Sequence, residues 1–388
     1  MGAPNSQLSG GSLAVGGLIA MASAVGIGRF IYTPILPPMV EALGLSKGQA
    51  GLIASANFAG YLAGAVAAAS PRVPGTQRSV LLAALLVSAV TTAGMAAADT
   101  MALAMALRFV GGLASAFALV FASALVLERL AAVGRSDLAA VHFAGVGTGI
   151  FVSAALVAMI GTDPGQWRAM WLGGGALTLL GLVLVAVLLP AAEPAVAEVT
   201  ASASMVKWRM TRLILAYGLF GFGYVITATF LIAMVRGSVE TVAYEPLMWM
   251  AFGLAAAPSV AIWVAVSKQT GTLGAFAIAC LAEAIGVLSG VLWPTPAGLA
   301  LSAVLVGGTF MGITALGLMA GRQIGADAPR RAVALLTAAF SLGQIVGPAV
   351  AGYGYDLTGS FFVGSLAAAG ALLMASGLAL SMQHRPKV

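Results

Sequence analysis

The chain has 388 residues, 61% of them hydrophobic and only 8% charged, with a formal net charge of +6. Soluble domains carry about 25% charged residues, so this composition excludes a water-soluble globule and indicates an integral membrane protein. The apolar runs are roughly 20 residues long, which is the length of a membrane-spanning helix and excludes the short strands of an outer-membrane barrel. In a membrane protein a positive net charge usually comes from Lys and Arg residues in cytoplasmic loops, so we expect no nucleic-acid partner.

Twelve apolar runs follow one another along the chain, separated by short stretches rich in Gly, Pro and charged residues. We predict spans over residues 12–36, 48–70, 79–98, 102–127, 138–160, 168–189, 211–235, 246–267, 273–293, 297–321, 332–354 and 360–381. The longest break is central and polar, so it divides the spans into six plus six. The predicted domains are a six-helix bundle over 1–190, a cytoplasmic linker over 191–210 and a second bundle over 211–388.

Basic residues outside the spans predict the orientation. If both termini face the cytoplasm, the outer loops hold only Lys47, Arg168 and Arg236. The inner loops and tails then hold Arg72, Arg78, Arg129, Arg135, Lys207, Arg209, Arg212, Lys268, Arg322, Arg330, Arg331, Arg385 and Lys387. This bias follows the positive-inside rule and predicts a multi-pass protein of the bacterial inner membrane with both termini in the cytoplasm.

The two halves resemble each other at an offset of about 195 residues. VGIGRFIYTPILPPMV in span 1 aligns with FGFGYVITATFLIAMV in span 7, which pairs Arg29 with Tyr224. RFVGG in span 4 aligns with VLVGG in span 10, which pairs Arg108 with Val304. Two six-span halves in the same orientation are a transporter architecture with a substrate site near the middle of the membrane, between the halves.

The whole chain resembles a twelve-helix transporter of the major facilitator superfamily. The segments GIGRFIYTPILPPMV, ASANFAGYLAGA, LRFVGG, HFAGVGTGI and GQIVGPAVAGYGYDLTGSF are similar to its bacterial YbfB/YjiJ-like subfamily. The resemblance implies an all-α fold of two pseudo-symmetric six-helix bundles that rock to alternate access to a central cavity. Two departures weaken a drug/proton antiporter interpretation, because SPRVPGTQR lacks the superfamily's usual aspartate and GVGTG lacks the antiporter Gly-Pro.

Two arginines lie inside spans, Arg29 in span 1 and Arg108 in span 4. Their guanidinium groups stay charged, and burying them costs a few kcal/mol or more, so they need a function or an internal partner. Both are predicted to bind an anionic substrate. For Arg29 the alternatives are an internal salt bridge, with Glu283 as candidate partner, and anchoring to backbone carbonyl groups. For Arg108 the alternatives are proton coupling and hydrogen bonds to backbone carbonyls.

Uncharged polar side chains in other positions complete the candidate substrate site. Tyr32 and Thr33 lie three and four residues beyond Arg29, so on a regular helix they would share its face. Asn57 and Tyr61 show the same spacing in span 2. Tyr224 in span 7 and Gln344 in span 11 are the candidates from the second half. For each of them a packing role is the alternative.

Glu283, His142 and Arg108 are the candidates for proton coupling, against structural roles. The sequence shows no cluster of metal-ligating residues, because His142 and His384 are far apart in the sequence and Cys280 is the single cysteine. The glycine runs lack the context of a phosphate-binding loop. We therefore expect no cofactor, no metal, no catalytic residues and no enzymatic activity.

These features predict a secondary active transporter of a small, monocarboxylate-like organic anion, with protons as the candidate coupling ion. The expected partners are this anion and the lipid bilayer, and we expect a monomer. The alternative is an exporter of hydrophobic, drug-like or lipidic compounds by proton antiport, in which both arginines would have structural or coupling roles.

Overall fold

The computed structural model describes residues 10–383 except positions 71, 162, 190–206 and 327–328. Most of the predicted linker over 191–210, the two tails and His384 therefore lie outside the described residues. The described part is helical and contains twelve helices long and apolar enough to cross a membrane, which confirms the predicted number of spans.

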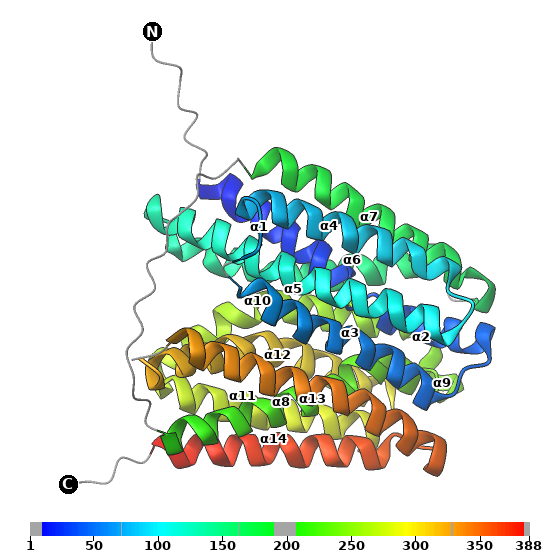
Figure 1. Cartoon of the computed structure of the whole chain (residues 1–388). Coiled ribbons are helices and arrows are strands. Elements are labelled where there is room, and N and C mark those ends of the chain that lie inside the picture. The colour runs from blue at the N-terminus through cyan, green and yellow to red at the C-terminus, as the bar shows by residue number, and fades with distance from the viewer. Residues whose placement is uncertain (1–9, 71, 162, 190–206, 327–328, 384–388) are drawn as a thin grey trace.

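Seven α-helices form the first bundle, which occupies the upper part of Figure 1. They are α1 (Gly10–Met21), α2 (Tyr32–Leu43), α3 (Lys47–Ala68), α4 (Gln77–Gly94), α5 (Met101–Ala132), α6 (Ala139–Ile160) and α7 (Trp167–Leu188). The second bundle contains α8 (Lys207–Val235), α9 (Val239–Val242), α10 (Glu245–Thr270), α11 (Thr272–Leu292), α12 (Pro296–Ile324), α13 (Pro329–Thr358) and α14 (Phe362–Gln383).

Short polar residues start several of these helices. Ser46 accepts a hydrogen bond from the backbone of Gln49 while the Gln49 side chain accepts one from Ser46, so α3 begins with a capping box. Thr76 caps α4 in the same manner, and Thr100 and Thr295 accept N-terminal N–H groups of α5 and α12. These caps satisfy backbone donors that would otherwise be unpaired at the membrane surface.

The first span is longer than predicted. The sequence LPPMVEAL was expected to leave the membrane helix near residue 36, but α2 continues to Leu43 and ends at Gly44, whose φ of 63° only glycine adopts easily. Two prolines, Pro37 and Pro38, lie inside α2. Proline fixes a helical φ, so the helix continues although its hydrogen bonding is incomplete. Together α1, a π-helical turn over Ala22–Ile27 and α2 form one span over Gly10–Leu43.

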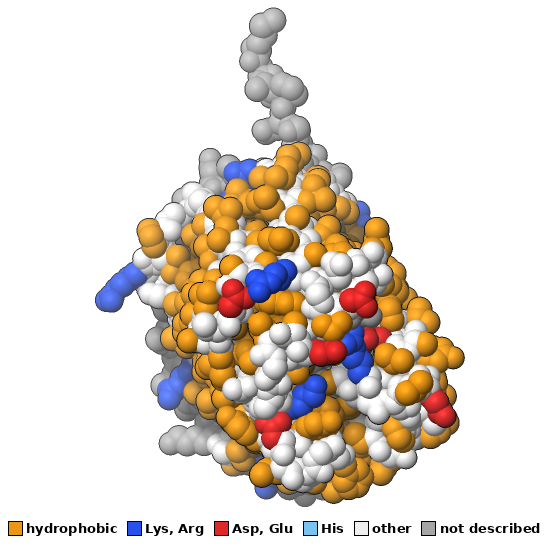
Figure 2. Space-filling model, turned by 90° about the vertical axis from the view of Figure 1, so that its right-hand side faces the viewer, with side chains coloured by type: hydrophobic (Ala, Val, Ile, Leu, Met, Phe, Trp, Pro, Cys, Tyr) orange, Lys and Arg blue, Asp and Glu red, His pale blue; other side chains and the backbone are white. Residues whose placement is uncertain are grey.

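The helix ends gather at two ends of the molecule. We call the end that holds Gly10, the start of α8 and Gln383 the terminal end, and the opposite one, with Leu43, Val235 and Thr358, the loop end. Figure 2 faces the loop end, where acidic and basic side chains lie beside one another. Arg236 of the second bundle pairs there with Glu245 at 2.6 Å and with Glu41 of the first bundle at 3.9 Å.

Two antiparallel seams join the bundles. In one, α3 packs along α13, and a Cβ added to Gly51 would lie 2.2 Å from the carbonyl oxygen of Pro348. In the other, α6 packs along α10, and a Cβ on Gly147 would lie 2.2 Å from the backbone nitrogen of Ala257. Small residues let the backbones approach this closely. Within the described residues, no seam of comparable extent joins α5 to α12.

The structure corrects the register of the repeat by one residue in the α5–α12 pair. A Cβ on Gly112 would lie 1.9 Å from the carbonyl oxygen of Asn57, and one on Gly307 would lie 2.4 Å from that of Phe252. Both pairs are related by the same offset of 195 residues, so Gly112 corresponds to Gly307. The place of Arg108 is then taken by buried Ala303 and not by the aligned Val304, which is 46% exposed.

The Gly112 contact gives a stability prediction. Because a methyl group at Gly112 meets rigid backbone, Gly112→Ala is expected to lower the free energy of unfolding by about 2 kcal/mol. Thermal unfolding of the purified protein in detergent measures this change. Gly370→Ala is the matched control, since nothing lies within 4 Å of its added Cβ. Equal unfolding temperatures for the two variants would contradict the packing argument.

Candidate substrate-binding site

The first span is not a regular helix where Arg29 lies. Pro34 has no N–H, and the N–H of Thr33 donates to the carbonyl oxygen of Phe30 at 3.2 Å instead of to that of Arg29. The N–H of Gly28 reaches back five residues to Ser23 at 3.0 Å. This local geometry separates α1 from α2 and leaves carbonyl groups inside the membrane region in need of other donors.

Arg108 supplies those donors. Its Nη1 donates to the carbonyl oxygen of Gly28 at 3.0 Å, and its Nη2 donates to that of Arg29 at 2.9 Å. The guanidinium carbon lies 5.1 Å from the centre of the Tyr32 ring. In turn, the Asn57 amide donates to the carbonyl oxygen of Arg108 at 2.8 Å. Arg108 therefore joins the irregular segment between α1 and α2 to α5 by hydrogen bonds.

Arg29 has a different environment although it is only 6% exposed. Its guanidinium carbon lies 4.1 Å from the ring centre of Tyr61, 5.1 Å from that of Phe58 and 5.6 Å from that of Phe30. Its Nε and Nη2 atoms are buried without a hydrogen-bond partner. These two atoms form one edge of the guanidinium plane and carry parallel N–H bonds, which is the geometry that binds both oxygens of a carboxylate.

The second bundle places Tyr224 and Gln344 across from Arg29. The Gln344 amide donates to the Tyr224 hydroxyl, while the Oε1 of Gln344 is buried without a partner. The Tyr224 ring stacks on Phe310 at 5.5 Å and on Phe340 at 5.8 Å. Arg29 is near enough to interact electrostatically with the Tyr224 phenol. Phe30, next to Arg29 in the chain, contacts Phe310, so Arg29 and Tyr224 lie near each other at the junction of the bundles.

Tyr32 and Thr33 do not share a regular helical face with Arg29, because the helix is broken between them. The Tyr32 hydroxyl donates to the carbonyl oxygen of Ala50 at 2.8 Å, inside the first bundle. The Thr33 hydroxyl donates to that of Ala228 at 2.6 Å, across the bundles. Both hydroxyls therefore have structural partners, and a role in binding substrate stays a prediction.

A family comparison decides what kind of protein carries this site. The family model described as "Uncharacterised MFS-type transporter YbfB" matches residues 21–380. The chain belongs to this family. MFS is the major facilitator superfamily, so the chain is a member of a transporter family, as the sequence resemblance predicted.

Solved structures agree with this membership. The crystal structure of a mutant of the nucleoside transporter NupG has a TM-score of 0.73 and 15% sequence identity, covering 96% of this chain and 100% of that one. A second NupG structure has a TM-score of 0.68 and 14% identity, with 97% and 99% covered. At such low identity these matches show the fold alone, and they confirm the predicted twelve-helix fold. None of the curated proteins matches the chain.

Neither of the two other titratable candidates of this family member forms an ion pair with Arg29 in the described part of the chain. Glu283 on α11 is fully buried, and neither of its carboxyl oxygens has a hydrogen-bond partner. No ion pair joins it to Arg29 among the described residues. His142 on α6 is also fully buried, with its Nε2 3.0 Å from the Ser123 hydroxyl and its Nδ1 facing the backbone of Gly17.

The sequence interpretation missed the aromatic residues of the site, which it took for lipid-facing or core filling. Phe58 and Phe30 contact the Arg29 guanidinium, and Phe310 and Phe340 stack on Tyr224. The spacing held a signal, since Phe58 lies three residues before Tyr61 and Phe340 lies four before Gln344. Such pairs share a helix face with the polar candidates.

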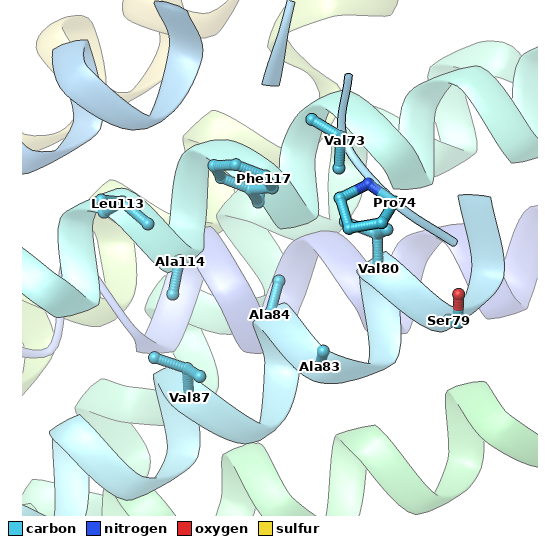
Figure 3. Close-up of a pocket in the computed structure, with 10 residues that line it drawn as sticks. All are labelled: Val73, Pro74, Ser79, Val80, Ala83, Ala84, Val87, Leu113, Ala114 and Phe117. Carbon is cyan, nitrogen blue, oxygen red and sulfur yellow. The ribbon is translucent and has the colours of Figure 1, made fainter. Parts of the chain in front are cut away.

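A separate groove of about 450 Å³ lies between α4, α5 and the loop that precedes α4. Figure 3 shows the ten side chains that line it, from Val73 to Phe117, and Ser79 is the one polar residue among them. The groove contains none of the predicted site residues. The lining offers an anion no charged group, and the Ser79 hydroxyl already donates to the carbonyl oxygen of Thr76, so we keep the Arg29 cluster as the candidate site.

Proposed function

We propose that this protein is a secondary active transporter that moves a small organic anion across a bacterial inner membrane. The carrying observation is the buried Nε–Nη2 edge of Arg29, which has two donors and no acceptor. Buried charges are normally paired, so the missing acceptor is best supplied by a ligand. A carboxylate offers two oxygens with the matching geometry.

In this proposal Arg108 is a positioning residue. It holds the carbonyl groups of Gly28 and Arg29, so it fixes the direction of the Arg29 side chain without contacting the substrate. Asn57, Tyr61, Tyr224 and Gln344 complete the proposed site. Asn57 Oδ1 and Gln344 Oε1 are buried acceptors without partners, and they are free to meet donors on the substrate.

Alternating access follows from the two seams. Basic residues concentrate at the terminal end, so the positive-inside rule makes that end cytoplasmic and the loop end external. Hydrogen bonds and ion pairs join the bundles at the loop end, whereas α5 and α12 have no extensive seam. We therefore take the structure as a state closed at the loop end with the candidate residues buried, and rocking about the Arg29–Tyr224 junction would open that end.

Glu283 is the favoured proton-coupling residue. A carboxyl group buried without a counter-ion is most stable as the neutral acid. The titratable groups near it are the Tyr224 phenol and the Cys280 thiol, and Thr309 of α12 also faces it. Through Tyr224 the acid is adjacent to the Arg29 cluster. A neutral Glu283 would add no negative charge beside the anion that Arg29 holds.

Glu283→Gln tests the coupling. The amide keeps the shape of the neutral acid but cannot release a proton, so we expect exchange of internal for external anion to persist while an inward proton gradient no longer drives accumulation. Both are measured in proteoliposomes, with and without an imposed pH step. Accumulation equal to that of the unmodified protein would exclude Glu283 as the coupling site.

Flux in proteoliposomes tests the function. The panel consists of labelled lactate, benzoate, uridine and ethidium, with protein-free liposomes at pH 7.5 correcting for passive entry. We expect uptake of carboxylates, and loss of it in Arg29→Gln by about 30-fold or more, because a charge-assisted bidentate contact is removed. Uptake of uridine alone would indicate a nucleoside transporter, as the NupG structures are described. Efflux of ethidium would indicate an exporter of drug-like compounds. Either result would overturn the anion proposal.

A further inference from the structure

The substrate class can be narrowed from the groups that surround the Arg29 edge, on the basis that the proposed anion transport is correct. The face of the guanidinium is already covered, because the Tyr61 ring centre lies 4.1 Å from its central carbon. The partnerless Nε and Nη2 atoms point along the plane instead. A carboxylate that pairs with them lies in the guanidinium plane, so the rest of the ligand extends away from Arg29 in a defined direction.

Aromatic rings surround the Arg29–Tyr224 junction. Phe30 of the first bundle contacts Phe310 of the second with ring centres 5.7 Å apart and planes at 66°. Phe310, Tyr224 and Phe340 form a nearly parallel stack, with interplanar angles of 9° and 3° to the central ring. The faces of these rings cover one another, so the stack presents ring edges, and edge-to-face contacts with a flat ring contribute attraction beyond simple area burial.

Gln344 adds a polar requirement at the same stack. Its amide nitrogen donates to the Tyr224 hydroxyl, which fixes the orientation of the amide group. Its Oε1 atom is then a buried acceptor without a donor. A buried acceptor left unpaired is costly, so a ligand that brings an O–H or N–H to it gains more than one that does not.

We propose that the substrate is a planar aromatic carboxylate with a hydrogen-bond donor on its ring. The carboxylate pairs with the Nε–Nη2 edge of Arg29, the ring packs against the edges of Tyr224 and its stacking partners, and the ring hydroxyl or amino group donates to Gln344 Oε1. Three observations on both bundles carry this assignment: the free donor edge, the parallel aromatic stack and the free acceptor.

Thermal-shift titrations of the purified full chain test the aromatic part, because a ligand of the native state raises its unfolding temperature, and the concentration dependence of that rise gives the affinity. Benzoate and cyclohexanecarboxylate form a matched pair with the same carbon count and one carboxylate each. We expect benzoate to bind about 10-fold more tightly, since only an aromatic ring can make edge-to-face contacts with the stack. Equal affinities would overturn the aromatic assignment but leave anion transport standing. Failure of every carboxylate to bind would instead reject the proposed function itself.

The hydroxybenzoates test the donor part. The best of the three isomers is expected to exceed benzoate by about 5-fold in affinity, and Gln344→Met should lower this affinity ratio to about 1. The ratio is the readout, because a packing defect would weaken the binding of both ligands alike. An advantage that persists in Gln344→Met, or hydroxybenzoates that never exceed benzoate, would exclude Gln344 as the acceptor.

Discussion

Arg108→Ala is expected to lower the free energy of unfolding by about 4 kcal/mol, because the carbonyl groups of Gly28 and Arg29 lose their donors inside the membrane region. Each unpaired buried group costs about 1–3 kcal/mol, and the lost packing against Tyr32 adds to the total. The measurement is the unfolding midpoint of purified protein, together with the fraction that elutes as a single species from a sizing column.

Two variants control this prediction. Arg108→Lys keeps one compact cation and can serve one carbonyl well, so its loss should be intermediate. Arg168 is an exposed arginine that donates to Asp99 and to the carbonyl oxygen of Ala96, and Arg168→Ala should cost about 1 kcal/mol or less. If Arg108→Ala were as stable as Arg168→Ala, the hydrogen bonds of Arg108 to Gly28 and Arg29 would not stabilise the fold.

Asp356→Ala is expected to open the loop end. Asp356 lies in the last turn of α13, and its carboxylate accepts hydrogen bonds from the Ser46 hydroxyl at 2.7 Å and from the N–H groups of Lys47 and Gly48 at 3.0 and 2.9 Å. It thus caps the N-terminus of α3 from the other bundle, where the helix dipole favours a negative charge. Its loss should shift the equilibrium toward the loop-end-open state by about 10-fold or more.

Spin-label distances measure that shift. Labels on Asp163→Cys and Val239→Cys, both exposed at the loop end of different bundles, are placed in a Cys280→Ser background. A longer distance population should grow in Asp356→Ala. Asp99→Ala is the matched control, because Asp99 is an exposed aspartate of the same end whose Arg168 partner lies in its own bundle. An unchanged distance distribution in Asp356→Ala would show that the cap does not hold the seam closed.

Hydropathy alone predicted the twelve spans, because each must be about 20 apolar residues long to cross the bilayer. The same reasoning failed at LPPMVEAL, where prolines suggested an end and the helix continues to Leu43. The repeat was visible, but glycine-rich segments align equally well one residue apart. Only the backbone contacts of Gly112 and Gly307 decide that Ala303, not Val304, corresponds to Arg108.

The site was predictable in its charges and not in its contacts. Their positions inside predicted spans marked Arg29 and Arg108 as costly intramembrane cations. The sequence analysis therefore predicted substrate binding for both. The structure separates them, because Arg108 donates to two carbonyl groups and Arg29 keeps a free edge. The Asp356 cap joins positions 308 to 310 residues apart, so no local pattern could predict it.

Isothermal titration of benzoate and of benzamide tests the central claim, that Arg29 holds the carboxylate of the substrate. The two ligands have the same ring and nearly the same shape, so their affinity ratio reports the charge. We predict that the unmodified protein favours benzoate by about 30-fold or more, that Arg29→Lys retains part of this preference, and that Arg29→Gln binds both equally. A benzoate preference that survives in Arg29→Gln would contradict the account.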